Sequence, residues 1–523
     1  MEPRTHVIQG PAPGAGAPTP GADDALIAAL NGARLGRFHL RAAVTAGMGF
    51  FTDAYDLFII GVVITILRHQ WHLTTTEVSL LGSTSLVAAF VGAFVFGRIA
   101  DLFGRKKVYG VEAAIMVVGA LASAFAPGII WLVVARFVLG VGIGGDYPVS
   151  AVLMSEYSNT RDRGKLVGLV FSMQALGLIV GPLVGIILIG SHVSPGLAWR
   201  LMLGLGALPA AAVILARRRM PESPRFQAGV QGQGERAATQ LAAYSRGAVQ
   251  AGASPAAAAG PGAADRGPKA GRLGLGSFLS DRRLLVTLIG TAGTWFLFDY
   301  AYYGNTISTP FILQTIAPHA SELTTLTFTL VIFVAAALPG YLLACATMDR
   351  IGHRRLQLIG FAMMAVAFLV IGLVPGVTAA AAPFLAVYGL SYFFSEFGPN
   401  TTTFVMSAEL FPVSVRTTGH GLSAGTAKVG AFIGVFVFPL LSATLGLRGT
   451  LLVTAAFALV GVALTRVLPE PARRDLEAVS AGAQVTDITS GRSGRGQGQG
   501  RGRDGRRAAA TSSASLQPEY QAG

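Results

Sequence analysis

Cysteine and charge are both scarce in this chain of 523 residues, which has one cysteine and only 13% charged residues. A single cysteine, Cys345, excludes an intramolecular disulfide and leaves the redox compartment undetermined. In soluble domains about a quarter of the residues are charged, roughly twice the fraction found here. Hydrophobic residues make up 52% of this chain. The composition therefore argues against an ordinary soluble domain and indicates a protein that lies in lipid.

Residue groupings typical of enzymes and metal proteins are also missing. The sequence has no Ser/His/Asp arrangement, no cluster of metal ligands and no phosphate-cradling loop at strand-to-helix spacing. Four histidines fall in loops between apolar blocks, where solvated surface positions are expected: His69, His72, His192 and His319. We therefore expect neither an enzyme nor a bound metal, and no cofactor.

The net charge of +14 could indicate a nucleic-acid partner, but the basic residues lie in short loops and tails beside apolar blocks. Membrane topology explains them better, and we expect no nucleic-acid partner. Residues 1–33 are rich in Gly, Pro and Ala without a compact apolar stretch and cleavage site, so no signal peptide is expected. We expect the first span to direct insertion.

Apolar blocks of membrane-spanning length recur along the chain in two sets of six. They predict an all-α integral membrane protein with twelve transmembrane helices. The expected organisation is a disordered N-terminus (1–40), an N-terminal six-helix half (41–216), a flexible Ala/Gly-rich linker (217–283), a C-terminal six-helix half (284–468) and a disordered tail (469–523). Lys and Arg concentrate in the loops after even-numbered blocks, which places both termini in the cytoplasm.

An internal repeat supports two pseudo-symmetric halves. Asp-Leu-Phe-Gly-Arg-Lys-Lys at 101–107 returns as Asp-Arg-Ile-Gly-His-Arg-Arg at 349–355, and Pro-Glu at 221–222 returns at 469–470. The loop pair resembles that of the major facilitator superfamily, which implies a site between the halves near the bilayer midplane. The glycine permits a tight turn, and the aspartate can pair with a basic residue or a helix N-terminus. The residues expected to act as a conformational latch are Asp101, Gly104, Arg105, Lys106, Asp349, Gly352 and Arg354.

Ionisable residues within apolar blocks are costly and mark functional candidates. Gly-Gly-Asp-Tyr-Pro at 144–148, running on to Met-Ser-Glu-Tyr at 154–157, resembles the signature of the plant and fungal phosphate:proton symporters, a family that acts at the plasma membrane. Trp295, Asp299 and Tyr303 share one face of the seventh helix, because their spacing is i, i+4, i+8. In that family the equivalent residues surround phosphate, and the aspartate carries the coupled proton.

Two further stretches also resemble this family: Phe-Gly-Pro-Asn at 397–400, and Ser-Ala-Gly-Thr-Ala-Lys at 423–428. A Gly-Pro break exposes backbone donors, while an amide and a lysine offer what an oxyanion needs. Glu396 departs from the asparagine of many members and lies one turn from Asn400, where it faces a cavity or another helix. The expected substrate-binding residues are Tyr147, Gln174, Trp295, Asp299, Tyr303, Asn400 and Lys428.

The residues expected to carry protons are Asp53, Asp56, Glu112, Asp146 and Asp299. Arg136, ten residues before Asp146, is either a counter-ion for one of these acids or part of transport. The sequence thus predicts a proton-driven importer of inorganic phosphate, with phosphate, protons and the lipid bilayer as partners. Two alternatives remain. One is a symporter for a sugar, sulfate or an organic ion, since the loop 221–225 is shared with sugar carriers. The other is a phosphate sensor. Nothing indicates the oligomeric state.

Overall fold

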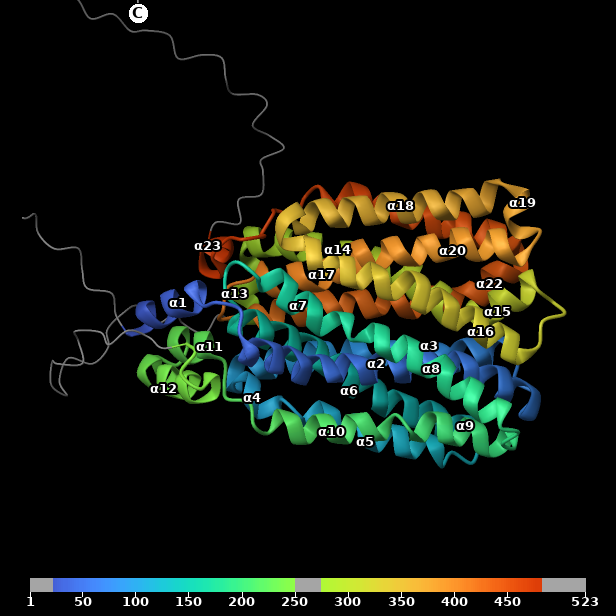
Figure 1. The fold of residues 1–523 in the computed structure, drawn as a ribbon, viewed down its shortest axis with the longest axis horizontal. Helices are drawn as coiled ribbons and strands as arrows, with labels where there is room; N and C mark the ends of the chain where they lie inside the picture. Colours follow the sequence, from blue (N-terminus) through green and yellow to red (C-terminus); the bar gives the residue numbers. More distant parts are fainter. Residues whose placement is uncertain (1–21, 250–273, 482–523) are drawn as a thin grey trace, which may run out of the picture. The chain divides into compact units, whose positions relative to one another are not determined.

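The computed structural model describes residues 22–249 and 274–481, and every regular element in these ranges is a helix. Long helices run side by side along most of the molecule (Figure 1). The N-terminal half is formed by α2 (Arg37–Gln70), α3 (Thr75–Phe103), α4 (Arg105–Val108), α5 (Val111–Ala124), α6 (Ile129–Tyr157), α7 (Arg163–Ser172), α8 (Gln174–Gly190), α9 (Pro195–Gly204) and α10 (Ala207–Arg217).

The C-terminal half repeats this pattern with two interrupted spans. It consists of α14 (Arg282–Ile307), α15 (Thr309–Ile316), α16 (Glu322–Ile332), η2 (Phe333–Ala337), α17 (Leu338–Ile351), α18 (His353–Leu373), α19 (Pro375–Thr378), α20 (Ala381–Ser395), η3 (Glu396–Asn400), α21 (Thr401–Glu409) and α22 (Arg416–Thr465). The segments η2 and η3 are single π-helical turns, which often occur at functional sites.

Ten helical stretches among the described residues are long and apolar enough to cross a membrane, and four of them combine consecutive elements: α4–α5, α7–α8, α9–α10 and α16–α17. Helix α22 has 50 residues, more than twice what one crossing needs, and it bends at Gly446, whose φ of 68° suits glycine. Helices α20 and α21 make one further crossing, interrupted at η3 where Gly398 and Pro399 break the helical hydrogen bonds. The count is therefore twelve crossings in two halves, as the sequence predicts.

Short helices gather at one end of the long ones (Figure 1) and correct three expectations. We expected disorder in 1–40 and 469–523, but α1 (Ala22–Gly32) and α23 (Leu476–Ala481) are helical; the remainder of both ranges outside 22–481 is not described. The linker contains α11 (Pro224–Gly229), α12 (Gly234–Ser245) and α13 (Leu275–Ser280), with Phe226 and Leu241 buried. Arg225 explains the order, because its guanidinium donates to Asn31 of α1 at 2.6 Å and to Glu477 of α23 at 2.5 Å.

The two halves approach closely along α3 and α22, where small residues replace bulky ones. A methyl group added at Gly97 of α3 would lie 2.8 Å from the Thr417 carbonyl oxygen of α22. One added at Gly421 of α22 would lie 2.4 Å from the Ala93 carbonyl oxygen of α3. These glycines therefore permit backbone contact between the halves, as in other closely packed membrane helices.

Candidate functional site: a buried polar chain between the halves

A buried ion pair lies within the C-terminal half, between α14 and α22. Asp299 and Tyr303 project from the same face of α14, and Lys428 reaches them from α22. The Lys428 ammonium donates to Asp299 Oδ2 at 2.8 Å and to the Tyr303 hydroxyl at 2.9 Å, and all three side chains are buried. It also lies over the Tyr147 and Tyr303 rings, 4.5 and 4.2 Å from their centroids. One cation thus neutralises one carboxylate within an aromatic cage.

Residues of the N-terminal half complete this cage. The Tyr147 hydroxyl of α6 lies 3.2 Å from the Tyr303 hydroxyl, and Gln174 at the start of α8 donates to Tyr147 at 2.9 Å. The Trp295 ring lies 6.1 Å from the Tyr147 ring, with Phe404 packed edge-on against both. Hydrogen bonds and aromatic contacts therefore join the two halves at one buried place.

A second polar branch runs from Gln174 to the broken tenth span. The Tyr341 hydroxyl of α17 donates to Gln174 Oε1 at 3.2 Å and accepts from Asn400 Nδ2 at 2.8 Å. The same Asn400 amide donates to Glu396 at 2.5 Å, so Glu396 faces the polar chain rather than an apolar neighbour. The structure thus brings all seven predicted substrate-binding residues together, and it adds Tyr341, which sequence reasoning missed.

The predicted proton-carrying acids do not form one cluster. Asp146 and Glu112 share Arg217, whose guanidinium lies 2.7 and 2.9 Å from their carboxylate oxygens. Asp53 lies one turn beyond Gly49, where a Cβ would collide with Asp146. Its charge interacts with those of Asp146, Arg217, Asp56 and Lys428, so Asp53 lies near both ion pairs, and neither of its carboxylate oxygens has a hydrogen-bond partner among the described residues.

Asp56 and Arg136 lie apart from these ion pairs. Arg136 donates to the Asp56 backbone carbonyl at 2.6 Å, and neither Asp56 carboxylate oxygen has a hydrogen-bond partner among the described residues. Arg136 forms no ion pair with a predicted acid in the described part of the chain, but its charge interacts with that of Asp56, so it is a counter-charge for Asp56 rather than for Asp146 or Glu112. The cation that neutralises Asp146 and Glu112 is Arg217, which the sequence analysis had assigned to the linker boundary.

The repeated loops meet the opposite half at helix N-termini. Asp101 accepts hydrogen bonds from the Thr418 N–H at 2.6 Å and hydroxyl at 2.7 Å, in the first turn of α22. Asp349 accepts from the N–H groups of Gly164 and Lys165, at 3.0 and 2.7 Å, in the first turn of α7. Each aspartate therefore carries negative charge to the positive end of a helix in the other half.

Each repeated loop is capped by a glutamate that follows the last helix of its half, Glu222 after α10 and Glu470 after α22. Glu222 accepts from the Lys106 N–H at 3.2 Å, and Glu470 accepts from the Arg354 N–H at 3.0 Å. Gly104 and Gly352 have φ values of 104° and 101°, and a Cβ on either would collide with the glutamate. Burial raises the pKa of the Glu222 carboxyl, against the N–H donors and the Arg105 charge that lower it. Lys106 and Arg354 thus contact these glutamates through their backbone N–H groups, and the Arg354 guanidinium also donates to the Arg466 carbonyl oxygen at 2.9 Å.

Buried ion pairs surround both loops. Arg105 contacts Asp101 at 3.1 Å and Glu156 at 3.2 Å, and Arg416 reaches the same glutamate at 3.1 Å. Around the second loop, Arg163 of the N-terminal half contacts Glu409 of the C-terminal half at 3.0 Å, and His353 lies 3.6 Å from the same glutamate. The pairs Arg416–Glu156 and Arg163–Glu409 join the two halves, so this end of the molecule is closed.

We expect Asp349→Asn to open this end, because it removes the charge that faces the α7 N-terminus in the other half. Cys345 lies one turn earlier on α17 and is buried, with Gly168 of α7 close to its sulfur. Its rate of labelling by a maleimide should rise about tenfold, the effect of roughly 1.4 kcal/mol. Asp281→Asn is the matched control, because Asp281 caps its own helix α14. An unchanged rate would contradict the latch role.

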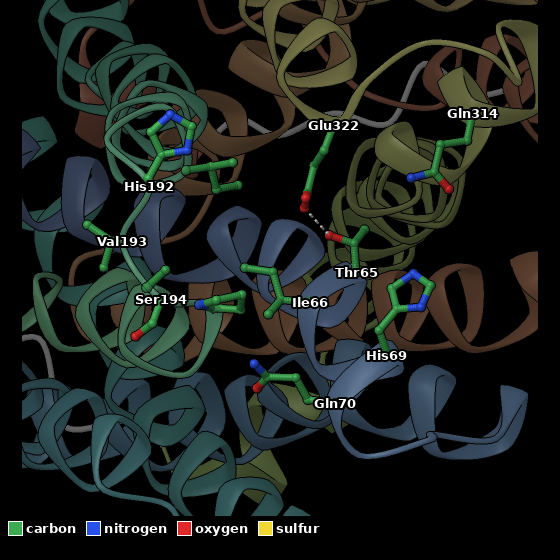
Figure 2. A pocket seen from close by; sticks show the side chains of 12 residues that line it. Thr65, Ile66, His69, Gln70, His192, Val193, Ser194, Gln314 and Glu322 are labelled. Carbon is green, nitrogen blue, oxygen red and sulfur yellow. Dashed lines mark hydrogen bonds between the residues drawn. The ribbon is translucent and has the colours of Figure 1, made fainter.

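Two cavities lie between the halves at the other end of the long helices. One, of about 560 Å³, is drawn in Figure 2; Thr65 of α2 donates across it to Glu322 of α16 at 3.0 Å. The second, of about 420 Å³, reaches inward to Gly61 and Ile307. Phe58, one turn deeper on α2, stacks on Tyr303 at 5.5 Å. This aromatic contact therefore lies one helical turn beyond the inner end of the second cavity, next to the buried ion pair.

Twelve crossings in two halves, a buried polar site between them and loops that close one end define a membrane transporter of the major facilitator class. A solved proton:xylose symporter, XylE, superposes with a TM-score of 0.68 at 17% identity, covering 86% of this chain and 99% of XylE. The family model Sugar (and other) transporter matches residues 42–482. The chain belongs to this family, and it is a multi-pass membrane transporter rather than an enzyme.

Relatives with closer sequences cover nearly the whole chain. A probable inorganic phosphate transporter 1-6 of Arabidopsis thaliana is 33% identical over 88% of this chain and 97% of its own length. A putative inorganic phosphate transporter 1-13 of Oryza sativa subsp. japonica is 36% identical over 86% and 92%. A repressible high-affinity phosphate permease of Neurospora crassa is 32% identical over 87% and 88%.

Proposed function

We propose that this protein is a proton-coupled symporter that imports inorganic phosphate across the plasma membrane by alternating access. The observation that carries the proposal is the buried pair Lys428–Asp299, surrounded by the uncharged donors of Gln174, Asn400 and two tyrosines. Oxyanions are bound by a cation together with several hydrogen-bond donors. The names of the plant and fungal relatives support phosphate as that oxyanion.

Proton coupling follows from the competition for Lys428. While Asp299 is ionised, it neutralises the ammonium and would repel an anion. Protonation removes that charge, frees Lys428 for phosphate and gives Asp299 a hydrogen to donate. Each ligand therefore raises the affinity for the other, as thermodynamic linkage requires.

Alternating access would use the two ends of the molecule differently. Phosphate enters through the cavities near Thr65 and passes the Phe58–Tyr303 contact, while the repeated loops keep the cytoplasmic end closed. Release of Asp101 and Asp349 from their partner helices then opens that end. Asp53 interacts electrostatically with both Arg217 and Lys428, and so it suits proton transfer from Asp299 toward Asp146 and Glu112.

The charge balance sets a minimum number of protons. Moving a monovalent anion inward against 100 mV, inside negative, costs about 2.3 kcal/mol. One proton only cancels the charge of the anion, so accumulation driven by the potential requires more than one. Several acids along the route are consistent with this requirement.

The test is uptake of labelled phosphate by the purified protein in liposomes under an imposed pH gradient. We expect uptake only when the outside is acidic, with competition by unlabelled phosphate and none by sulfate or glucose. Uptake of labelled glucose or sulfate in place of phosphate would assign the protein to another substrate. Lys428 paired with Asp299 favours the oxyanion, since a neutral sugar needs no cation.

A further inference from the structure

Glu396 is a buried carboxylate that the proposed coupling scheme does not use. It begins the π-helical turn η3, and its side chain is fully buried. Its Oε2 accepts the hydrogen bond from Asn400 at 2.5 Å, while Oε1 has no hydrogen-bond partner among the described residues. A buried carboxylate that lacks a partner on one oxygen needs an explanation.

Among the described residues, the surroundings of Glu396 contain hydrogen-bond donors and no cation within ion-pair distance. Three phenols face it from separate helices: Tyr302 of α14, Tyr341 of α17 and Tyr392 of α20. Helix α18 approaches η3 with Gly360, which is uncharged, and α21 continues directly from it. Within the described residues Glu396 forms no ion pair, in contrast to Asp299 and Asp146. An ionised carboxylate is therefore poorly accommodated here, whereas a neutral carboxyl group fits.

A continuous set of hydrogen bonds links Glu396 to Asp299. It passes in order through Asn400, Tyr341, Gln174, Tyr147, Tyr303 and Lys428, with donor–acceptor distances from 2.5 to 3.2 Å. Every member is buried, and the proposed phosphate ligands make up most of the chain. The two carboxyl groups thus lie at opposite ends of one polar network.

We propose that Glu396 is a second proton-coupling carboxyl group of the transport site, which carries one proton inward with each phosphate. This inference rests on the proposed function and extends it. When Glu396 is protonated, phosphate can bind Asn400 without a negative charge one helical turn away. When this end opens to the cytoplasm, water accepts the Glu396 proton as hydronium, and the resulting carboxylate expels phosphate from Asn400.

The test compares wild type with Glu396→Gln, which keeps an acceptor for Asn400 but cannot ionise. With the membrane potential clamped at zero, the logarithm of the steady-state phosphate ratio rises with the imposed pH difference. Its slope is the number of protons carried per monovalent phosphate, since one proton contributes about tenfold per pH unit. We expect the slope to fall by one in Glu396→Gln and to stay unchanged in Glu235→Gln, a matched substitution of an exposed glutamate on α12.

A second measurement makes the result independent of flux. At a pH at which Glu396 is ionised in the free protein, phosphate binding to purified protein in weakly buffered detergent should take up one proton fewer in Glu396→Gln than in wild type. Glu396→Asn gives the same neutral charge if the glutamine variant does not fold. An unchanged slope and unchanged proton uptake would overturn the role of Glu396, whereas absence of phosphate uptake by wild type would overturn the proposed function instead.

Discussion

Replacing Asp299 with asparagine is expected to remove one proton per phosphate from pH-driven accumulation, which lowers the internal-to-external phosphate ratio about tenfold per unit of pH difference at zero potential. Asparagine keeps the shape of the side chain and can still accept from Lys428, but it has no proton to exchange. In wild type, protonation of Asp299 should strengthen phosphate binding about 5–150-fold, the usual range of coupling between two ligands. In the variant this pH dependence disappears.

The measurement is labelled phosphate uptake in liposomes with and without an imposed pH gradient, together with phosphate affinity across a pH series. Asp281→Asn, at the start of the same helix, serves as the control, because Asp281 caps α14 far from Lys428. Accumulation by Asp299→Asn with the wild-type dependence on the pH difference would show that Asp299 carries no coupled proton. Loss of binding at every pH would instead indicate a purely structural ion pair.

The number and placement of the membrane spans were predictable from sequence because each needs a long apolar run. Two features of the fold were not predictable in this way: the continuous helix α22, and the helical structure of α1 and α23. Gly446 turns so tightly that two crossings form one 50-residue helical element. The order of α1 and α23 could not be predicted, because both depend on Arg225, which lies 194 and 252 residues away from its partners.

The site residues were predictable as a set, but their partners were not. A buried polar or charged side chain in a span is costly, so each of them is visible in the sequence. Which carboxylate pairs with which cation depends on helix packing. Lys428 lies 129 residues from Asp299, and Tyr341 lies 167 residues from Gln174. The sequence did not reveal the role of the repeated Pro-Glu dipeptides, whose glutamates, Glu222 and Glu470, cap the two loops in the structure.

Arg217 is the residue whose role the sequence concealed most fully. It ends the sixth apolar block beside Arg218 and Arg219, and so it resembles the basic residues that set membrane topology. One signal was present: Glu112 and Asp146 both lie in spans and require a cation. The structure supplies that cation from α10, with the guanidinium also stacked 4.1 Å from the Tyr109 ring centroid.

Arg217→Gln is expected to destabilise the protein by about 3–5 kcal/mol, because two buried carboxylates lose their only ion-pair partner among the described residues. Lysine should substitute poorly, since a single ammonium cannot reproduce the forked contact with both acids. Thermal unfolding of the purified protein in detergent measures the loss. Arg218→Gln is the matched control, because the adjacent side chain is exposed.

The double variant Arg217→Gln/Asp146→Asn separates stability from coupling. Removal of one carboxylate together with the arginine should restore part of the stability, and the pairwise term of the double-mutant cycle should exceed about 1 kcal/mol. If Asp146 carries protons, the restored protein should still bind phosphate but accumulate it with fewer protons. Full coupling in the stable double variant would show that Asp146 and Arg217 only hold α6 and α10 together.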